Sequence, residues 1–205
     1  MLKLFEPIRG VHLLQSLNAW MQTSQTLTTL FPILADIFVF VYPVYFLVLY
    51  IYGMATRQKY YKNSALFIFI GTILSIIINL GIQFFVNKTR PNFILGLKDL
   101  KQETILHNFL PTSSFPSDHA ALSMGIAISS LIRGIKNKDK KFIYFGIILI
   151  IFSLIMGFSR IITAVHRPTD IIGGSMIGIL IPLILLNKKL YRLLDRVFTW
   201  IGKII

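Results

Sequence analysis

The sequence predicts an all-α integral membrane protein, a bundle of five to six transmembrane helices with an amphipathic helix at the N-terminus. The chain of 205 residues is 55% hydrophobic and has a mean hydropathy of +0.71, whereas soluble domains are roughly 45–50% apolar. The excess is gathered in long runs, which is typical of membrane spans. The net charge of +13 lies mostly between those runs, where it suits lipid headgroups and membrane topology better than nucleic acid.

Five apolar runs are the expected spans. They are Phe31–Tyr52, Ala65–Val86, Ser117–Ile132, Phe142–Phe158 and Ile171–Leu186. A helix needs about 20 residues to cross about 30 Å of hydrocarbon, so the third and fifth runs fall short. They can serve only if their polar starts lie inside the protein, where irregular backbone is tolerated when it lines a site.

The two ends of the chain are more polar than the spans. Residues 1–28 mix apolar and polar side chains, which favours an amphipathic helix on the outer interface with Trp20 as an anchor. A sixth span is the alternative for this segment. The tail Tyr191–Ile205 also looks amphipathic. Without an internal repeat or a linker, residues 1–205 are expected to form a single membrane-embedded domain.

Basic residues set the predicted orientation. The segments Gly53–Ser64, Arg133–Lys141 and the tail after Leu186 hold 13 of the 21 lysines and arginines. These segments alternate along the chain so that all three can lie on one side, which the positive-inside rule makes cytoplasmic. The polar motifs then fall together on the outer side, where residues 87–116 form an outer loop beside the predicted active site.

The first polar motif, residues 88–91 (Lys-Thr-Arg-Pro), ends the second span. Proline stops the helix and holds Arg90 near extended backbone, and a guanidinium offers a planar fork of donors for phosphate oxygens. The alternative is an arginine that snorkels to headgroups. Asn79 and Gln83 lie on the same helix face as Arg90, either as part of the site or as helix–helix hydrogen bonds.

The second motif, residues 116–119 (Pro-Ser-Asp-His), opens the third span. Ser117 or Asp118 can cap the helix, and the free backbone N–H groups of its first turn can bind a phosphate. His119 lies within one turn and could protonate a leaving oxygen. The alternative is an ordinary cap followed by an incidental histidine.

The third motif runs from Ser159-Arg160 through His166 to Asp170. A carboxylate near a histidine fixes the tautomer of the ring and stabilises its cation, and a histidine oriented in this way can act as a nucleophile. The alternative is a helix-capping aspartate near an interfacial histidine. Asp36, an acid inside the first span, is a further functional candidate, or else a capping residue.

No metal or cofactor is expected from these residues. The motifs lack a carboxylate cluster for Mg²⁺ and a third neighbouring histidine for Zn²⁺, since His12 and His107 are isolated along the chain. The chain has no cysteine, which excludes thiolate sites and cysteine nucleophiles.

In this order, the three motifs resemble those of the type 2 phosphatidic acid phosphatase (PAP2) superfamily over residues 30–186. The pattern of that superfamily is Lys-x6-Arg-Pro, Pro-Ser-Gly-His and Ser-Arg-x5-His-x3-Asp. The resemblance implies a PAP2-like helical bundle and a metal-independent lipid phosphatase. It also implies a role for each matching residue: His166 as the phosphohistidine nucleophile, Asp170 as its orienting acid, His119 as the proton donor, and Arg90, Ser117 and Arg160 as phosphate ligands.

Two positions depart from that pattern. Gln83 stands where the family has lysine, and Lys88 could partly replace that charge from the loop. Asp118 stands where the family has glycine, and it could pair with Lys88 or Arg167 or bind a cation carried by the substrate. The Pro-Ser-Asp-His sequence looks like the bacterial undecaprenyl-diphosphate phosphatase branch that is linked to bacitracin resistance.

The leading expectation is therefore a phosphatase in the bacterial inner membrane that acts on its outer face. It would hydrolyse undecaprenyl diphosphate to undecaprenyl phosphate and so recycle the lipid carrier of peptidoglycan synthesis. The alternatives are a phosphatase for phosphatidate, phosphatidylglycerophosphate or lipid A, and a non-catalytic lipid transporter. The expected partners are a polyprenyl or phospholipid phosphate and membrane lipids, without nucleic acid; the oligomeric state stays open.

Overall fold

A computed structural model describes residues 8–86, 88–92, 113–187, 189–190, 192–194 and 196. For residues 8–10 it describes the backbone alone. Most of the predicted outer loop 87–116 and most of the predicted amphipathic tail Tyr191–Ile205 lie outside the described residues.

All regular structure in the described ranges is helical, which confirms the predicted all-α class. The elements are α1 (Ile8–Met21), α2 (Gln25–Asp36), the 3₁₀ helix η1 (Ile37–Phe40), α3 (Val41–Ala55), α4 (Lys59–Val86), α6 (Asp118–Asn137), α7 (Lys140–Ile162) and α8 (Pro168–Ile184). Each of the five predicted apolar runs coincides with one of these helices or, for the first run, with the continuous stretch from α2 to α3.

In the described part of the chain, three helical stretches are long and apolar enough to cross a membrane. They are Gln25–Ala55 with 31 residues, Lys59–Val86 with 28 and Lys140–Ile162 with 23. The apolar helix α8 is shorter, with 17 residues, and α6 is the helix with a buried, more polar interior face. The two predicted short spans are therefore α6 and α8, and both begin at a polar motif.

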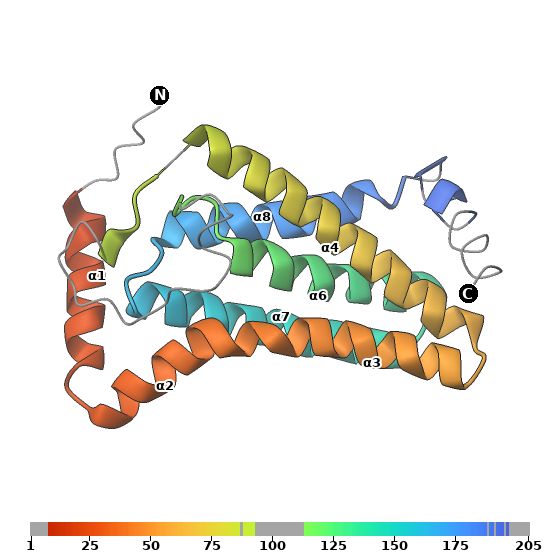
Figure 1. Ribbon diagram of the computed structural model, residues 1–205, viewed down its shortest axis with the longest axis horizontal. Helices are drawn as coiled ribbons and strands as arrows, with labels where there is room; N and C mark the ends of the chain where they lie inside the picture. The colour runs from red at the N-terminus through yellow and green to blue at the C-terminus, as the bar shows by residue number, and fades with distance from the viewer. Residues whose placement is uncertain are drawn as a thin grey trace.

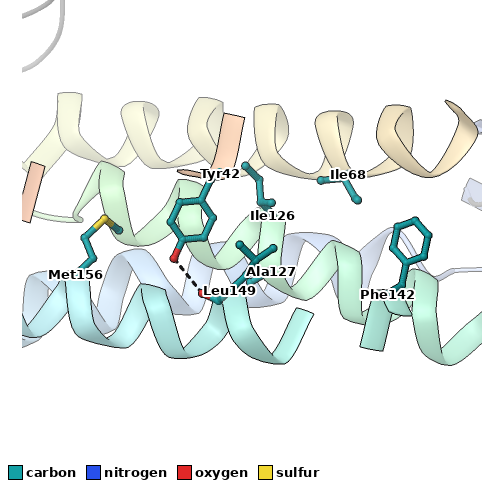
Figure 2. Packing of buried hydrophobic residues seen from close by; sticks show 7 residues of the cluster. All are labelled: Tyr42, Ile68, Ile126, Ala127, Phe142, Leu149 and Met156. Atoms are coloured by element: carbon teal, nitrogen blue, oxygen red, sulfur yellow. Dashed lines mark hydrogen bonds between the residues drawn. The ribbon is translucent and has the colours of Figure 1, made fainter. Parts of the chain in front are cut away.

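The helix α6 lies at the centre of the bundle and packs against α4, α7 and α8 (Figure 1). A cluster of buried apolar side chains joins α3, α4, α6 and α7, as Figure 2 shows, and within it the Tyr42 hydroxyl donates to the Leu149 carbonyl at 2.9 Å. Glycine brings α8 against α6: a Cβ at Gly174 would lie 2.3 Å from the Ser117 carbonyl oxygen. Small residues permit such close helix contacts in membranes, and this one brings the starts of α6 and α8 together.

The N-terminal helix α1 lies across one end of the bundle, at the left of Figure 1. At 14 residues it is too short to cross the hydrocarbon core. One face is packed, with Leu14 and Met21 buried and the Asn18 amide donating to the Ile162 carbonyl at 3.3 Å. The other face exposes Leu13 and Trp20. The predicted N-terminal helix of residues 1–28 is thus divided in the structure, because α1 ends at Met21 and α2 begins at Gln25, and its place at the membrane interface stays a prediction.

Candidate active site

The three polar motifs meet at the end of the bundle that α1 covers. The C-terminal ends of α4 and α7 and the N-terminal ends of α6 and α8 all lie at this end (Figure 1). The segment 88–92 follows α4 and contacts the loop after α7, because the backbone N–H of Asn92 donates to the Ala164 carbonyl at 3.0 Å. Residues that are far apart in sequence therefore share one polar site.

The carboxylate of Asp170 joins the three motifs, and the residue is fully buried at the first turn of α8. Its Oδ2 accepts from the Ser114 hydroxyl at 2.5 Å and from the Arg167 backbone N–H at 2.9 Å. Its Oδ1 accepts from the Lys88 ammonium at 2.9 Å. Its backbone carbonyl accepts from the Ser117 N–H at 3.0 Å. Asp170 therefore caps α8 and fixes the relative position of all three motifs.

The ring of His166 lies in the loop between α7 and α8 and is 2% exposed. Its Nδ1 lies 2.8 Å from the Ser114 carbonyl oxygen and 3.8 Å from Asp170 Oδ2. A carbonyl can only accept, so Nδ1 carries the proton and the lone pair stays on Nε2. Burial lowers the pKa of His166 to about 4, because desolvation disfavours the charged form. The ring is neutral at pH 7, as a nitrogen nucleophile must be.

Three buried side chains near His166 each have a donor atom that makes no hydrogen bond with the described residues. These atoms are Nε of Arg90, Nε of Arg160 and Oγ of Ser117. Both arginines lie close enough to His166 for their charges to lower its pKa, although less than burial does. A buried donor without a partner costs about 1–3 kcal/mol. Two guanidinium groups and a hydroxyl left in this state are suited to an anion with several oxygens.

The helix α2 contributes an acid to the same site. The Arg160 guanidinium donates through Nη1 to the Ala35 carbonyl at 2.9 Å and to Asp36 Oδ1 at 2.5 Å. The same Oδ1 lies 3.8 Å from Nε2 of His119. Asp36 therefore contacts one predicted phosphate ligand and the predicted proton donor.

The two departures from the superfamily pattern contact each other. The Gln83 and Asn79 amides donate to Asp118 Oδ1 at 2.8 Å and 2.7 Å. Both amides also donate to the Pro116 carbonyl, at 2.7 Å and 3.3 Å. The side-chain nitrogen of Gln83 is thus occupied in holding the second motif and is not turned to a phosphate.

The pairing that we expected for Asp118 is wrong in both its forms. Lys88 contacts Asp170 and the Thr169 hydroxyl, while the Arg167 guanidinium donates to the Thr89 carbonyl at 3.2 Å. The amides of α4 can reach Asp118 because they lie one turn apart on the face that packs against α6. Lys88 therefore serves the third motif and not the second.

Among the described residues, histidines and acids do not gather into a group of three that could hold a metal ion. Among the unpartnered buried atoms, the Nε–H groups of Arg90 and Arg160 can only donate and carry positive charge, so they suit an anion. The chemistry that these side chains fit is therefore the binding of an oxyanion beside a neutral imidazole.

Ser114 is the site residue that sequence reasoning missed. It is fully buried, and its hydroxyl and its carbonyl connect Asp170 with His166. The available signal was its position, two residues before the second motif, at the end of the run of hydroxyl residues 112–114. Asp36 was identified as an intramembrane acid, but its two contacts could not be derived from sequence, because α2 is far from both partners along the chain.

Comparisons with known proteins agree with this geometry. The model of the PAP2 superfamily matches residues 64–193. Undecaprenyl-diphosphatase BcrC of Bacillus subtilis (strain 168) is 27% identical over 180 residues, 86% of this chain and 79% of that protein. Putative undecaprenyl-diphosphatase YbjG of Escherichia coli (strain K12) is 24% identical over 197 residues, 93% of this chain and 89% of that protein.

A solved structure shares the fold. The crystal structure of Aquifex aeolicus LpxE superposes with a TM-score of 0.61 at 23% sequence identity. The match covers 90% of this chain and 99% of LpxE. The helical arrangement described above is therefore one that an experimentally determined protein also adopts.

Proposed function

Because this chain belongs to the PAP2 superfamily, we propose that it is an integral-membrane phosphatase that hydrolyses undecaprenyl diphosphate to undecaprenyl phosphate and phosphate. Two similar proteins carry the name undecaprenyl-diphosphatase, and the chain covers most of their length. The apolar helices that cross the membrane would place a site at one end of the bundle within reach of a lipid headgroup.

The observation that carries the proposal is the set of unpaired donors around a neutral histidine. Arg90, Arg160 and Ser117 each keep a buried donor atom without a partner, while His166 offers a free Nε2. A terminal phosphoryl group has three oxygens that can take these donors. Charge on those oxygens grows or is redistributed as the phosphorus reacts, and preorganised donors stabilise that change.

In the first step, Nε2 of His166 attacks the terminal phosphorus and forms a P–N bond. The bond from phosphorus to the bridging oxygen breaks, and its electron pair leaves with undecaprenyl phosphate. His119 donates its proton to that oxygen. The Ser114 carbonyl holds the proton on Nδ1 throughout the attack and keeps the ring in one orientation.

In the second step, water attacks the phosphohistidine. His119, now neutral, takes a proton from the water, and the P–N bond breaks to restore the His166 ring and release phosphate. Asp170 supports both steps by fixing Ser114 and Lys88 against the start of α8. No metal is required by this scheme, because the arginines supply the positive charge.

We place the site on the outer face of the bacterial inner membrane. The basic segments at the other end of the bundle, which include Arg133 and Lys136–Lys141, support this orientation by the positive-inside rule. Dephosphorylation there would return the lipid carrier to peptidoglycan synthesis. The resemblance to the branch linked to bacitracin resistance suggests that this activity would also contribute to resistance to that antibiotic.

The test is phosphate release by the purified protein in detergent, with undecaprenyl diphosphate, phosphatidate, phosphatidylglycerophosphate and lipid A as separate substrates. We expect the highest kcat/KM with undecaprenyl diphosphate and none above background in His166→Ala. A preference for phosphatidate would overturn the substrate, and equal rates in wild type and His166→Ala would overturn the mechanism. Trapping a ³²P-labelled protein by rapid acid-free quench, absent in His166→Ala, tests the covalent step.

A further inference from the structure

The acid Asp36 lies outside residues 64–193, the part of the chain that the superfamily model matches. It ends α2, and the 3₁₀ helix η1 follows directly at Ile37. A short 3₁₀ stretch inside a long helix often marks a functional position. In this chain, the 3₁₀ stretch directly follows Asp36, the acid through which the spanning stretch Gln25–Ala55 reaches the site.

Asp36 makes both of its polar side-chain contacts with groups of the site. The Arg160 guanidinium donates to Oδ1 at 2.5 Å, and Nε2 of His119 lies 3.8 Å from the same oxygen. Asp36 is 28% exposed at its side chain, whereas Arg160 is 3% exposed. The carboxylate therefore lies at the rim of the site and reaches inward to Arg160 and His119.

We infer that Asp36 is a positioning residue for the reaction: it keeps His119 protonated as the general acid and holds Arg160 in place for the phosphoryl group. This inference rests on the proposed phosphatase function. A general acid must carry its proton when substrate arrives. A carboxylate within about 4–6 Å favours the charged form of an imidazole.

The surroundings of His119 make such an acid necessary. Burial is the largest influence that disfavours a positive charge on the His119 ring, and the charges of Arg160 from α7 and Arg90 from the segment after α4 add to it. The His166 ring from the loop before α8 also faces His119 and is neutral at pH 7. Within the described part of the chain, Asp36 is the one carboxylate within 4 Å of His119, so it opposes the arginines that the phosphate itself requires.

The contact with Arg160 gives Asp36 a second effect. The Nη1 donor of Arg160 is used by Ala35 and Asp36, while Nε has no partner. An arginine held from one edge presents the rest of its fork in a fixed direction. Loss of the carboxylate would leave this guanidinium to be ordered by the substrate, which lowers affinity.

The experiment compares Asp36→Asn, which removes the charge and keeps the shape, with Asp36→Glu, which keeps the charge. Asp139→Asn is the matched control, since Asp139 caps α7 at the opposite end of the bundle. The kcat and KM for undecaprenyl diphosphate are measured between pH 5 and 9. For Asp36→Asn we expect the alkaline limb of kcat to move down by about one pH unit and KM to rise several-fold. Asp36→Glu should bring the alkaline limb of kcat most of the way back to its wild-type pH. Asp139→Asn should leave the limb at the wild-type pH.

A second measurement does not depend on turnover. The ring Cε1–H signal of His119, assigned by its loss in His119→Gln, is titrated by NMR in detergent micelles for wild type and Asp36→Asn. We expect the midpoint of this titration to fall by about one pH unit in the variant. Equal midpoints and an unchanged alkaline limb would overturn the inference, as would a KM effect alone. If wild type releases no phosphate from any lipid, the proposed function fails, and the NMR midpoints still decide the pairing of Asp36 with His119.

Discussion

Two buried arginines, one at each end of the bundle, have opposite surroundings. At the end where α6 ends and α7 begins, Arg133 lies over the rings of Tyr60 and Phe67, at 5.7 Å and 5.8 Å, and its Nε donates to the Ser64 hydroxyl. At the end that holds the candidate site, Arg160 is also buried, yet its Nε has no hydrogen-bond partner among the described residues. A cation enclosed by aromatic rings and a hydroxyl stabilises the fold. A cation with a free donor is prepared for a ligand, so the same side chain serves structure at one end and binding at the other.

The largest expected effect tests whether the end with the candidate site carries the activity. Replacing His166 by alanine removes the proposed nucleophile, and kcat should fall by about 10⁴-fold or more, as it does when other enzymes lose a nucleophile. Thermal unfolding of the purified variant, followed by circular dichroism in the same detergent, should change little. A variant that unfolds at the wild-type temperature and still turns over would contradict the assignment.

The arginine pair itself provides the next test. Arg160→Lys and Arg133→Lys make the same chemical change at the two ends. Lysine lacks the planar fork, so we expect Arg160→Lys to lower kcat/KM by about 10²-fold, as the loss of one preorganised donor does. We expect Arg133→Lys to keep kcat/KM within about two-fold and to lose about 1–2 kcal/mol of stability, since a buried hydrogen bond and ring contacts are lost. The reverse pattern would break the comparison.

Ser114→Ala should have a smaller effect. The variant removes the hydroxyl that donates to Asp170 and keeps the carbonyl that accepts from His166. We expect kcat to fall about ten-fold, roughly the value of one hydrogen bond to a charged group, with KM unchanged and activity recovered in Ser114→Thr. The control is Ser153→Ala, because Ser153 is a buried serine that bonds Ser123 within the bundle, away from the site. A loss of the same size in the control would assign the effect of Ser114 to general packing.

The sequence predicted the spans well because hydropathy reports which residues face lipid. The second predicted span, Ala65–Val86, ends where α4 ends, and α4 begins earlier, at Lys59, because polar residues can extend a helix out of the hydrocarbon. The 3₁₀ stretch Ile37–Phe40 has no signal in hydropathy, since it continues an apolar run without interruption.

For the site, the sequence predicted which residues lie together, but not which hydrogen bonds they make. Three motifs with fixed spacing indicated which residues meet, because each lies at the end of a span on the same side. Their partners were not predictable, because hydrogen bonding depends on where α4, α6 and α8 place each side chain. Gln83 was a candidate substrate ligand at the position where the superfamily has lysine, and its amide instead holds Asp118. The role of Ser114 in joining Asp170 to His166 likewise appears only when the chain is folded.

The smallest expected effect concerns pH and again separates the two arginines. Burial, and to a lesser degree the charges of Arg160 and Arg90, lower the pKa of His166 to about 4 in the folded protein, against about 6.5 in an unfolded chain. The neutral ring therefore contributes stability that is present above pH 6.5 and lost as the pH falls towards 4.

The acid limb of kcat/KM that belongs to His166 should lie below pH 5. Removing a nearby positive charge favours the protonated ring, so Arg160→Gln should move this limb to higher pH, by less than one unit, because burial is the larger cause. Arg133→Gln, at the opposite end of the bundle, should leave it in place. Equal limbs for both variants would mean that Arg160 acts on the substrate alone and not on the charge of the nucleophile.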